Sequence, residues 1–137
     1  MGERPRGSPP RRQREALLVA AGQALVRVVE ARVAAKLYLV TRADLPPGQQ
    51  AVQACHAMRE FVAEHPEVDL SWYTSSNHLA ILSVQDEAEL HRLINRAARR
   101  GVRFSLFREP DRNDELTAIA LEPAARRLCQ DLPLALA

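Results

Sequence analysis

The feature that most constrains the fold is the alternation of short apolar runs with segments long enough for helices. Three runs, at residues 36–42, 78–84 and 102–109, are separated by stretches that favour helices, a pattern typical of an α/β sheet. A fourth run, at residues 116–121, follows the third after the six residues 110–115. Because that link is too short for a parallel crossover, we expect a mixed four-stranded sheet flanked by helices on both faces.

The first helix between two strands is predicted over residues 48–64. It follows Pro46 and Pro47, which suit a loop and a first helical turn, and it ends before Pro66. We expect its apolar side to face the sheet, comprising Val52, Cys55, Met58 or Arg59, Phe61 and Val62. The polar and mixed residues 68–77 that follow predict a loop.

The second helix between strands, over residues 85–101, has the clearest boundaries. Asp86 is a predicted N-cap, and Glu89 stands three residues later at the capping-box spacing. Gly101 is the expected C-terminal stop. A short helix over residues 122–132 is expected to close the main domain, residues 36–137.

An extra helix is expected before the main domain. Residues 1–12 are rich in Pro, Gly and Arg, so we expect a disordered basic tail there. In residues 13–35 apolar side chains recur at steps of three and four, which predicts an amphipathic helix. Its apolar face needs a partner, either the main body or a second copy of the chain, which would make a homodimer.

Composition narrows the functional classes. The chain has 137 residues, enough for one core, and its 47% hydrophobic content is typical of a globular protein. Its two cysteines cannot form a disulfide framework, and no apolar run approaches the ~20 residues that span a bilayer. We therefore expect a cytoplasmic protein without membrane contact. The few glycines, histidines and cysteines, at unrelated spacings, match neither a phosphate loop nor a metal site, so no cofactor or metal is expected.

Arginines gather in two clusters, although the formal net charge is only +2. One cluster lies within residues 4–14, and the other consists of Arg96, Arg99, Arg100 and Arg103. Basic clusters attract phosphate backbones. The alternative is that arginine serves as the general surface cation, since Lys36 is the only lysine in the chain.

Two places carry side chains suited to catalysis. Gln49, Gln53 and His56 share one helical face, just after the carboxyl end of the first strand, where open α/β sheets collect ligands. The loop over residues 108–115 follows the third strand. If the first and third strands run in the same direction, a histidine and a loop carboxylate meet there as an acid–base pair. The alternative is that His56 caps local backbone and the loop is a solvated hairpin.

Cys55 is adjacent to His56 in the sequence, which rules out one kind of site. Neighbouring residues on a helix point about 100° apart, so these two side chains cannot act as nucleophile and base for each other. Cys55 also lies on the predicted apolar side of its helix. We therefore expect Cys55 in the core.

Three segments together resemble the type 2 peptidyl-tRNA hydrolases, the archaeal and eukaryotic type. They are "KLYLVTRADL", "GQQAVQACHA" and "FREPDRNDELTAIALEP". In that family a strand ends in Val-Arg-x-Asp-Leu, the first helix carries Ala-x-Gln-x-x-His-Ala, and a later loop carries Asp-x-Gly-Arg-Thr. The resemblance implies a mixed four-stranded sheet and hydrolysis of the ester between a peptide and the 3′ end of tRNA. It makes peptidyl-tRNA, or another tRNA, the expected partner.

The same resemblance implies roles for individual residues. Gln53 and His56 match the helix amide and imidazole, and Glu109 stands where the family has its loop aspartate. In the implied mechanism, His56 and Glu109 position or deprotonate a water that attacks the ester carbonyl. The implied substrate-binding residues are Arg42, Asp44, Gln49, Arg112 and Asn113.

The sequence departs from the family pattern in both loops. The segment "PPGQQ" is shorter than its counterpart and places Gln49 where a functional lysine is expected. In the second loop, Asp111 and Asn113 replace a glycine and a threonine. A neutral first loop and a more acidic second loop should bind phosphate less well. We therefore expect a divergent peptidyl-tRNA hydrolase, or alternatively a non-catalytic domain of the same fold that binds RNA or a protein.

Overall fold

The computed structural model describes residue 7 and residues 9–137, without the side chains of residues 24–34. The expected disordered tail, residues 1–12, falls mostly outside the described residues. The chain divides into two compact units, with the boundary between Val33 and Ala34.

Helix α1, Arg11–Ala34, lies in the first unit except for its last residue, and it begins two residues before the expected start. Leu17, Leu18 and Val19 are exposed on it. Because the side chains of residues 24–34 are not described, its apolar face and a homodimer through it stay predictions. Within the described part of the chain, no helix combines the length and apolar character that crossing a membrane requires.

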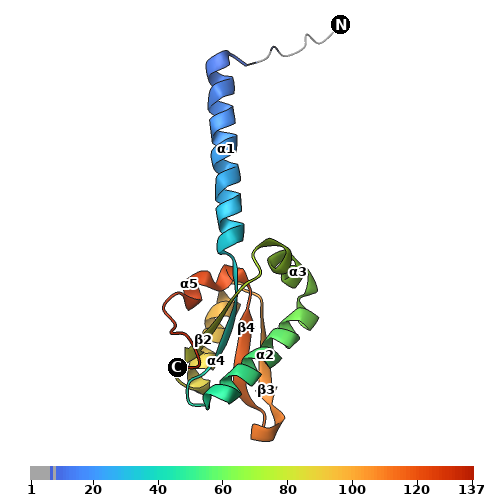
Figure 1. The fold of residues 1–137 in the computed structure, drawn as a ribbon, viewed down its shortest axis with the longest axis vertical. Coiled ribbons are helices and arrows are strands. Elements are labelled where there is room, and N and C mark those ends of the chain that lie inside the picture. Colours follow the sequence, from blue (N-terminus) through green and yellow to red (C-terminus); the bar gives the residue numbers. More distant parts are fainter. Residues whose placement is uncertain (1–6, 8) are drawn as a thin grey trace. The chain divides into compact units, whose positions relative to one another are not determined.

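The second unit is built on a four-stranded sheet with the order β2-β1-β4-β3 (Figure 1). Strand β1, Lys36–Arg42, pairs in parallel with β2, His78–Val84. Strand β4, Glu115–Leu121, runs antiparallel to both β1 and β3, Phe104–Glu109. The expected mixed α/β sheet is confirmed, and β1 and β3 run in the same direction.

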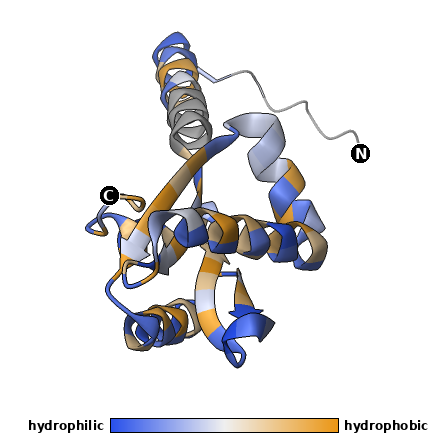
Figure 2. Ribbon diagram, turned by 60° about the horizontal axis from the view of Figure 1, so that its bottom comes forward, coloured by the Kyte–Doolittle hydropathy of each residue, from blue (hydrophilic) through white to orange (hydrophobic). Residues whose placement is uncertain are grey.

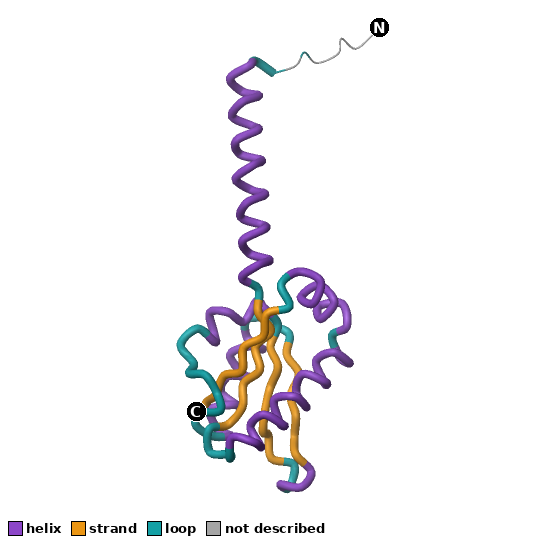
Figure 3. Tube along the Cα trace, in the orientation of Figure 1, coloured by secondary structure: helices purple, strands orange, loops and turns teal. Residues whose placement is uncertain are grey.

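Helices cover both faces of this sheet (Figures 1 and 3). Helices α2, Pro47–Glu64, and α3, Pro66–Ser75, pack on one face, over the core of Leu37, Leu39, Ala54, Ala57, Phe61, Trp72, Ala118 and Ala120. Helix α4, Glu87–Arg99, and the short α5, Arg126–Cys129, cover the other face and its larger core. The strands between these layers are mostly hydrophobic (Figure 2), as strands buried on both faces should be.

The buried side of α2 differs from the prediction. Val52 and Cys55 are exposed, so the placement of Cys55 in the core is wrong. The side chains that α2 buries are Gln50, Gln53, Ala54, Ala57 and Phe61. Alanines allow the helix to lie close to the sheet, and a buried amide is tolerated where it is hydrogen-bonded. The Nε2 of Gln50, for example, donates to the carbonyl of Leu45 at 2.7 Å.

Helix α3 occupies the segment predicted as a loop. Pro66 stands in its first turn with Glu67 and Asp69, which favour a helix N-terminus. Trp72 is buried and donates through its indole nitrogen to the carbonyl of His78 at 2.7 Å. One large anchored aromatic stabilises a helix whose other residues are mostly polar.

The ends of α4 agree with the prediction. The carboxylate of Asp86 accepts a hydrogen bond from the backbone amide of Glu89 at 3.0 Å, as an N-cap does. Gly101 adopts a φ of 66°, the left-handed conformation of a helix C-terminal stop. The remaining elements are two 3-10 turns, η1 at Pro110–Arg112 and η2 at Pro123–Ala125.

Candidate functional site

The two places singled out in the sequence meet at one edge of the sheet. Gln53 comes from the first half of α2, and Glu109 is the last residue of β3. The Nε2 atom of Gln53 donates to Oε2 of Glu109 at 2.8 Å. The parallel direction of β1 and β3 therefore brings together two side chains that are 56 positions apart in the sequence.

Thr117 fixes the other end of the Gln53 amide. Its hydroxyl donates to Oε1 of Gln53 at 2.7 Å. Between Phe107 and Arg108 the β3 pairing moves from Ala118 to Leu116, so Thr117 is an extra residue in β4. Such a bulge turns an additional side chain toward one face of the sheet. The bulge thus supplies the donor that determines which way the Gln53 amide points.

His56 lies beside this pair on the same helix. Its ring stacks on the ring of Phe107, with centroids 4.4 Å apart and planes at 14°. Phe107 and Glu109 are two residues apart in β3, so both project toward α2. His56 itself is exposed to solvent. An exposed imidazole with one ring face against an aromatic ring is accessible to a bound molecule.

Glu109 is held in its charged form. Its pKa is lowered, chiefly by the hydrogen bond from Gln53 and next by the hydrogen bond from the backbone amide of Asp111. Desolvation opposes these two hydrogen bonds, and the electrostatic effects of His56 and Arg112 lower the pKa by smaller amounts. The carboxylate is therefore ionised at neutral pH.

Arg42 lies at the same edge of the sheet but is fully engaged with protein groups. Its Nε and Nη2 donate to the two carboxylate oxygens of Asp44, both at 2.9 Å. Its Nη1 donates to Glu115 at 3.0 Å and to the carbonyl of Leu116 at 3.2 Å, and lies 3.4 Å from Glu87. The Arg42 side chain is only 7% exposed, and its guanidinium anchors the loops around the edge.

The charges around Arg42 stabilise one another. The pKa of Arg42 is raised, chiefly by its hydrogen bond to Asp44, and the pKa of Asp44 is lowered by the same bond. Arg112 donates through Nε to Glu115 at 3.1 Å, which is the largest cause of the lowered pKa of Glu115. Carboxylates outnumber guanidinium groups in this cluster, so its charge does not favour phosphate.

The other predicted binding residues lie apart from these contacts. Gln49 is exposed near the start of α2, and among the described residues its side chain has no hydrogen-bond partner. Asn113 is also exposed, and its φ of 54° places it in a left-handed turn with Asp114 at 58°. Asparagine and aspartate tolerate this conformation better than other residues with a side chain. Its position indicates a role in forming the turn.

Sequence reasoning missed Gln50, Thr117 and Phe107. Gln50 accepts a hydrogen bond from the backbone amide of Leu136 at 3.1 Å and so ties the C-terminal segment to α2. Its spacing of three from Gln53 was a usable signal, since both amides had to share a face. Thr117 and Phe107 gave no such signal, because their roles depend on the bulge and on sheet order.

A shallow hollow borders His56 on the outer side of α2. It has a volume of about 370 Å³ and is lined by Ala51, Val52, Cys55, His56 and Arg59. In the part of the chain that the structure describes, no group of three or more histidine, cysteine, aspartate or glutamate side chains is arranged to hold a metal ion. The chemistry available at this edge is that of an imidazole, a carboxylate and an amide.

Comparisons with known proteins agree with this architecture. The family profile described as "Peptidyl-tRNA hydrolase PTH2" matches residues 35–135. A solved structure of a protein of unknown function from Agrobacterium tumefaciens strain C58 is similar, with a TM-score of 0.54 and 16% identity. The similarity covers 74% of this chain and 97% of that one, and at this identity it concerns the fold alone. No significant match was found among curated proteins.

Proposed function

Because the chain belongs to the peptidyl-tRNA hydrolase PTH2 family, we propose that it hydrolyses the ester between a peptide and the 3′ end of tRNA. The observation that supports this most is the 2.8 Å hydrogen bond from Gln53 to Glu109, next to the exposed ring of His56. Two segments that are far apart in the sequence, and that both resemble the family pattern, thereby supply an imidazole, a carboxylate and an amide at one edge of the sheet.

In the proposed mechanism, His56 is the general base. It takes a proton from a water as the water oxygen attacks the ester carbonyl carbon. The tetrahedral intermediate then breaks its bond to the ribose oxygen, which receives the proton from His56. Glu109, ionised because its pKa is lowered, stabilises the imidazolium that forms between these steps. Gln53 holds the carboxylate of Glu109 in place.

The cations of the site take a different role in this proposal from the one expected in the sequence. Arg42 acts as a positioning residue, since Asp44, Glu87 and Glu115 occupy its guanidinium. Arg112 is bonded through Nε, while its two terminal nitrogens have no partner among the described residues. We assign these terminal nitrogens to the developing oxyanion or to a terminal phosphate of the substrate.

An alternative is a non-catalytic domain of the same fold that binds RNA or a protein. The observation that favours it is the lack of free positive charge at the site edge. Gln49 is neutral where the family pattern has a lysine, and the Arg42 guanidinium is hydrogen-bonded to the carboxylates of Asp44 and Glu115. Such a site would bind a tRNA end weakly. A homodimer through α1 is compatible with both functions and remains a prediction.

Glu109→Gln tests the assigned site. We expect this variant to release peptide from N-acetyl-aminoacyl-tRNA about 10²-fold more slowly than the wild type, because the charge beside His56 is lost. Asp111→Asn is the matched control, since it removes an exposed carboxylate two residues away. Equal rates for wild type and Glu109→Gln would remove Glu109 from the catalytic site.

A further inference from the structure

The outer side of α4 carries arginines that the proposed function does not use. Leu90, Leu93 and Ala97 turn the other side of this helix into the core. Arg92, Arg96 and Arg99 then follow at steps of four and three, which places them in one row on the solvent side. At a rise of 1.5 Å per residue, the row is about 10 Å long.

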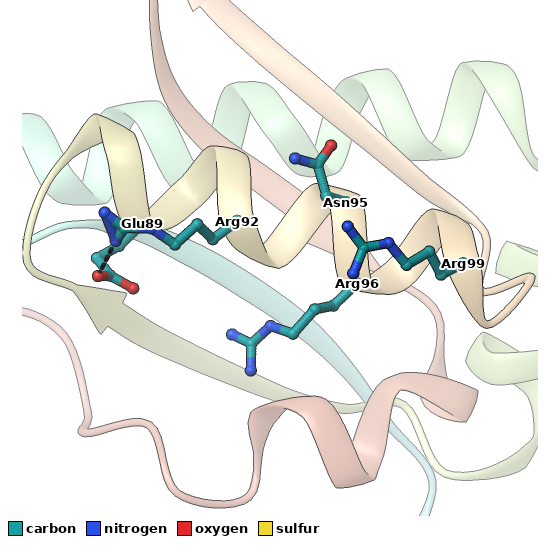
Figure 4. A pocket seen from close by; sticks show the side chains of 5 residues that line it. All are labelled: Glu89, Arg92, Asn95, Arg96 and Arg99. Atoms are coloured by element: carbon teal, nitrogen blue, oxygen red, sulfur yellow. Dashed lines mark hydrogen bonds and ion pairs between the residues drawn. The ribbon is translucent and has the colours of Figure 1, made fainter.

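These arginines border a hollow of about 430 Å³, which is lined by Glu89, Arg92, Asn95, Arg96 and Arg99. Figure 4 shows their side chains along α4, with Arg92 joined to Glu89. Arg96 and Arg99 have no carboxylate within ion-pair distance among the described residues. The hollow thus offers two guanidinium groups and one amide as uncommitted donors.

More positive charge continues beyond the end of α4. Arg100 and Arg127 border a second hollow of about 690 Å³, together with Glu122. Glu122 accepts a hydrogen bond from the backbone amide of Arg103, so part of its acceptor capacity is already used. Arg100, Arg103 and Arg127 are exposed and, within the described residues, have no ion-pair partner. We call Arg96, Arg99, Arg100 and Arg127 the α4 basic surface. Arg103 is not part of it, because Arg103 borders a different hollow together with Glu64 and Glu67.

The chemistry of this surface favours a phosphate backbone over a protein or a membrane. Guanidinium forks bind phosphate oxygens in pairs. Protein interfaces and membrane-bound faces need apolar anchors, and the large exposed hydrophobic residues of the described chain lie on other elements than α4 and α5. A polyanion without apolar parts is therefore the fitting partner.

We propose that the α4 basic surface binds the phosphate backbone of RNA, on the face of the sheet opposite to α2. The choice of tRNA as that RNA rests on the proposed function. This surface would grip the nucleic acid away from the ester, and would compensate for the lack of a lysine near the start of α2. The catalytic edge and the gripping surface then belong to different faces of one sheet.

The test is the salt dependence of binding to deacylated tRNA, which requires no hydrolysis. For Arg96→Gln/Arg99→Gln, we expect a dissociation constant several-fold higher than for the wild type. The slope of log K against log salt should be smaller by about two, one for each lost phosphate contact. Glu89→Gln, which releases Arg92, should tighten binding. Lys36→Gln, which removes one exposed positive charge elsewhere, should leave the slope unchanged.

Two results would overturn the proposal. One is an unchanged affinity and slope for Arg96→Gln/Arg99→Gln. The other is a loss of affinity and slope for Lys36→Gln that equals, per charge removed, the loss in the double variant. That result would show that binding depends on net charge and not on the position of the arginines. Hydrolysis of a short N-acetyl-aminoacyl oligonucleotide should be unaffected by the double substitution. If no form of the protein hydrolyses the ester but the substitutions change tRNA binding as predicted, the proposed hydrolase function is wrong. RNA binding by the α4 basic surface is then still supported.

Discussion

Gln53 and Glu109 are joined by a 2.8 Å hydrogen bond between helix α2 and the end of β3. The same Gln53 amide accepts a 2.7 Å hydrogen bond from Thr117 of β4. Three elements therefore determine where one carboxylate lies. If His56 is the base, the carboxylate of Glu109 that assists it is positioned by the buried amide of Gln53 and by the bulge at Thr117.

Gln53→Ala should raise the pKa of Glu109 toward its ordinary value, because the hydrogen bond from Gln53 is the largest cause of its lowering. It should also leave the Thr117 hydroxyl with only the longer, 3.4 Å contact to the carbonyl of Phe107, and reduce the free energy of unfolding by about 1–3 kcal/mol. NMR titration of the Glu109 carboxyl and urea unfolding measure the two effects.

The exposed Gln49 supplies the matched control for this substitution. Gln49→Ala should change neither quantity, since the side chain makes no hydrogen bond to the described residues. An unaltered Glu109 titration in Gln53→Ala would show that the amide does not control the carboxylate.

The sequence predicts the frame of this site well. The first two strands, 36–42 and 78–84, agree with the observed β1 and β2 residue for residue. The shortness of the link at 110–115 required an antiparallel pair, which β3 and β4 form. Because β1 and β3 run in the same direction, Gln53 and Glu109 meet at one edge of the sheet, as expected for that strand direction. The strand bounds and the antiparallel pair follow from periodicity and chain reach, which are local properties. The shared direction of β1 and β3 does not follow from them, and the structure supplies it.

The predictions are wrong or incomplete where contacts between distant segments determine which side chains are buried. The predicted apolar side of α2 included Val52 and Cys55, but the helix buries Gln50 and Gln53 in their place. Hydrophobicity alone favours the former pair, and only partners from other elements make the buried amides acceptable. The bulge at Thr117 likewise depends on how β3 and β4 register, which no local pattern in the chain specifies.

Arg42→Met should lower the free energy of unfolding by about 2–3 kcal/mol at neutral pH, because several charged hydrogen bonds are lost and three carboxylates remain close together. Urea unfolding at pH 7 measures this. Arg59→Met, at an exposed position with no ion-pair partner among the described residues, should change stability by less than about 0.5 kcal/mol.

The pH dependence gives an independent check on the Arg42 cluster. The pKa values of Asp44 and Glu115 are lowered in the folded protein. Their contribution to stability is therefore present above the unfolded values of about 4 and is lost as the pH falls through the folded values. Arg42→Met should lose less stability than the wild type between pH 5 and about 2. Parallel pH profiles for the two proteins would contradict this role of Arg42.

The two cysteines should react differently with a thiol reagent. Cys55 is exposed on α2, whereas Cys129 is buried and burial raises its pKa to about 11. Because the thiolate is the reactive form, the native protein at pH 8 should label once per chain, and the second label should appear only on unfolding. Mass spectrometry of Cys55→Ser should then show no rapid labelling. Rapid labelling of Cys129 in that variant would contradict the packing around α5.

Peptide release from N-acetyl-aminoacyl-tRNA by wild type and His56→Ala tests the central claim most directly. We predict complete release by the wild type and a rate lower by about 10²-fold or more for His56→Ala, with both proteins folded and binding deacylated tRNA equally. Asp111→Asn, which removes an exposed carboxylate outside the assigned site, should match the wild type. No release by the wild type, at concentrations where another hydrolase of this family completes the reaction, would contradict the account and leave the non-catalytic domain as the function of the fold.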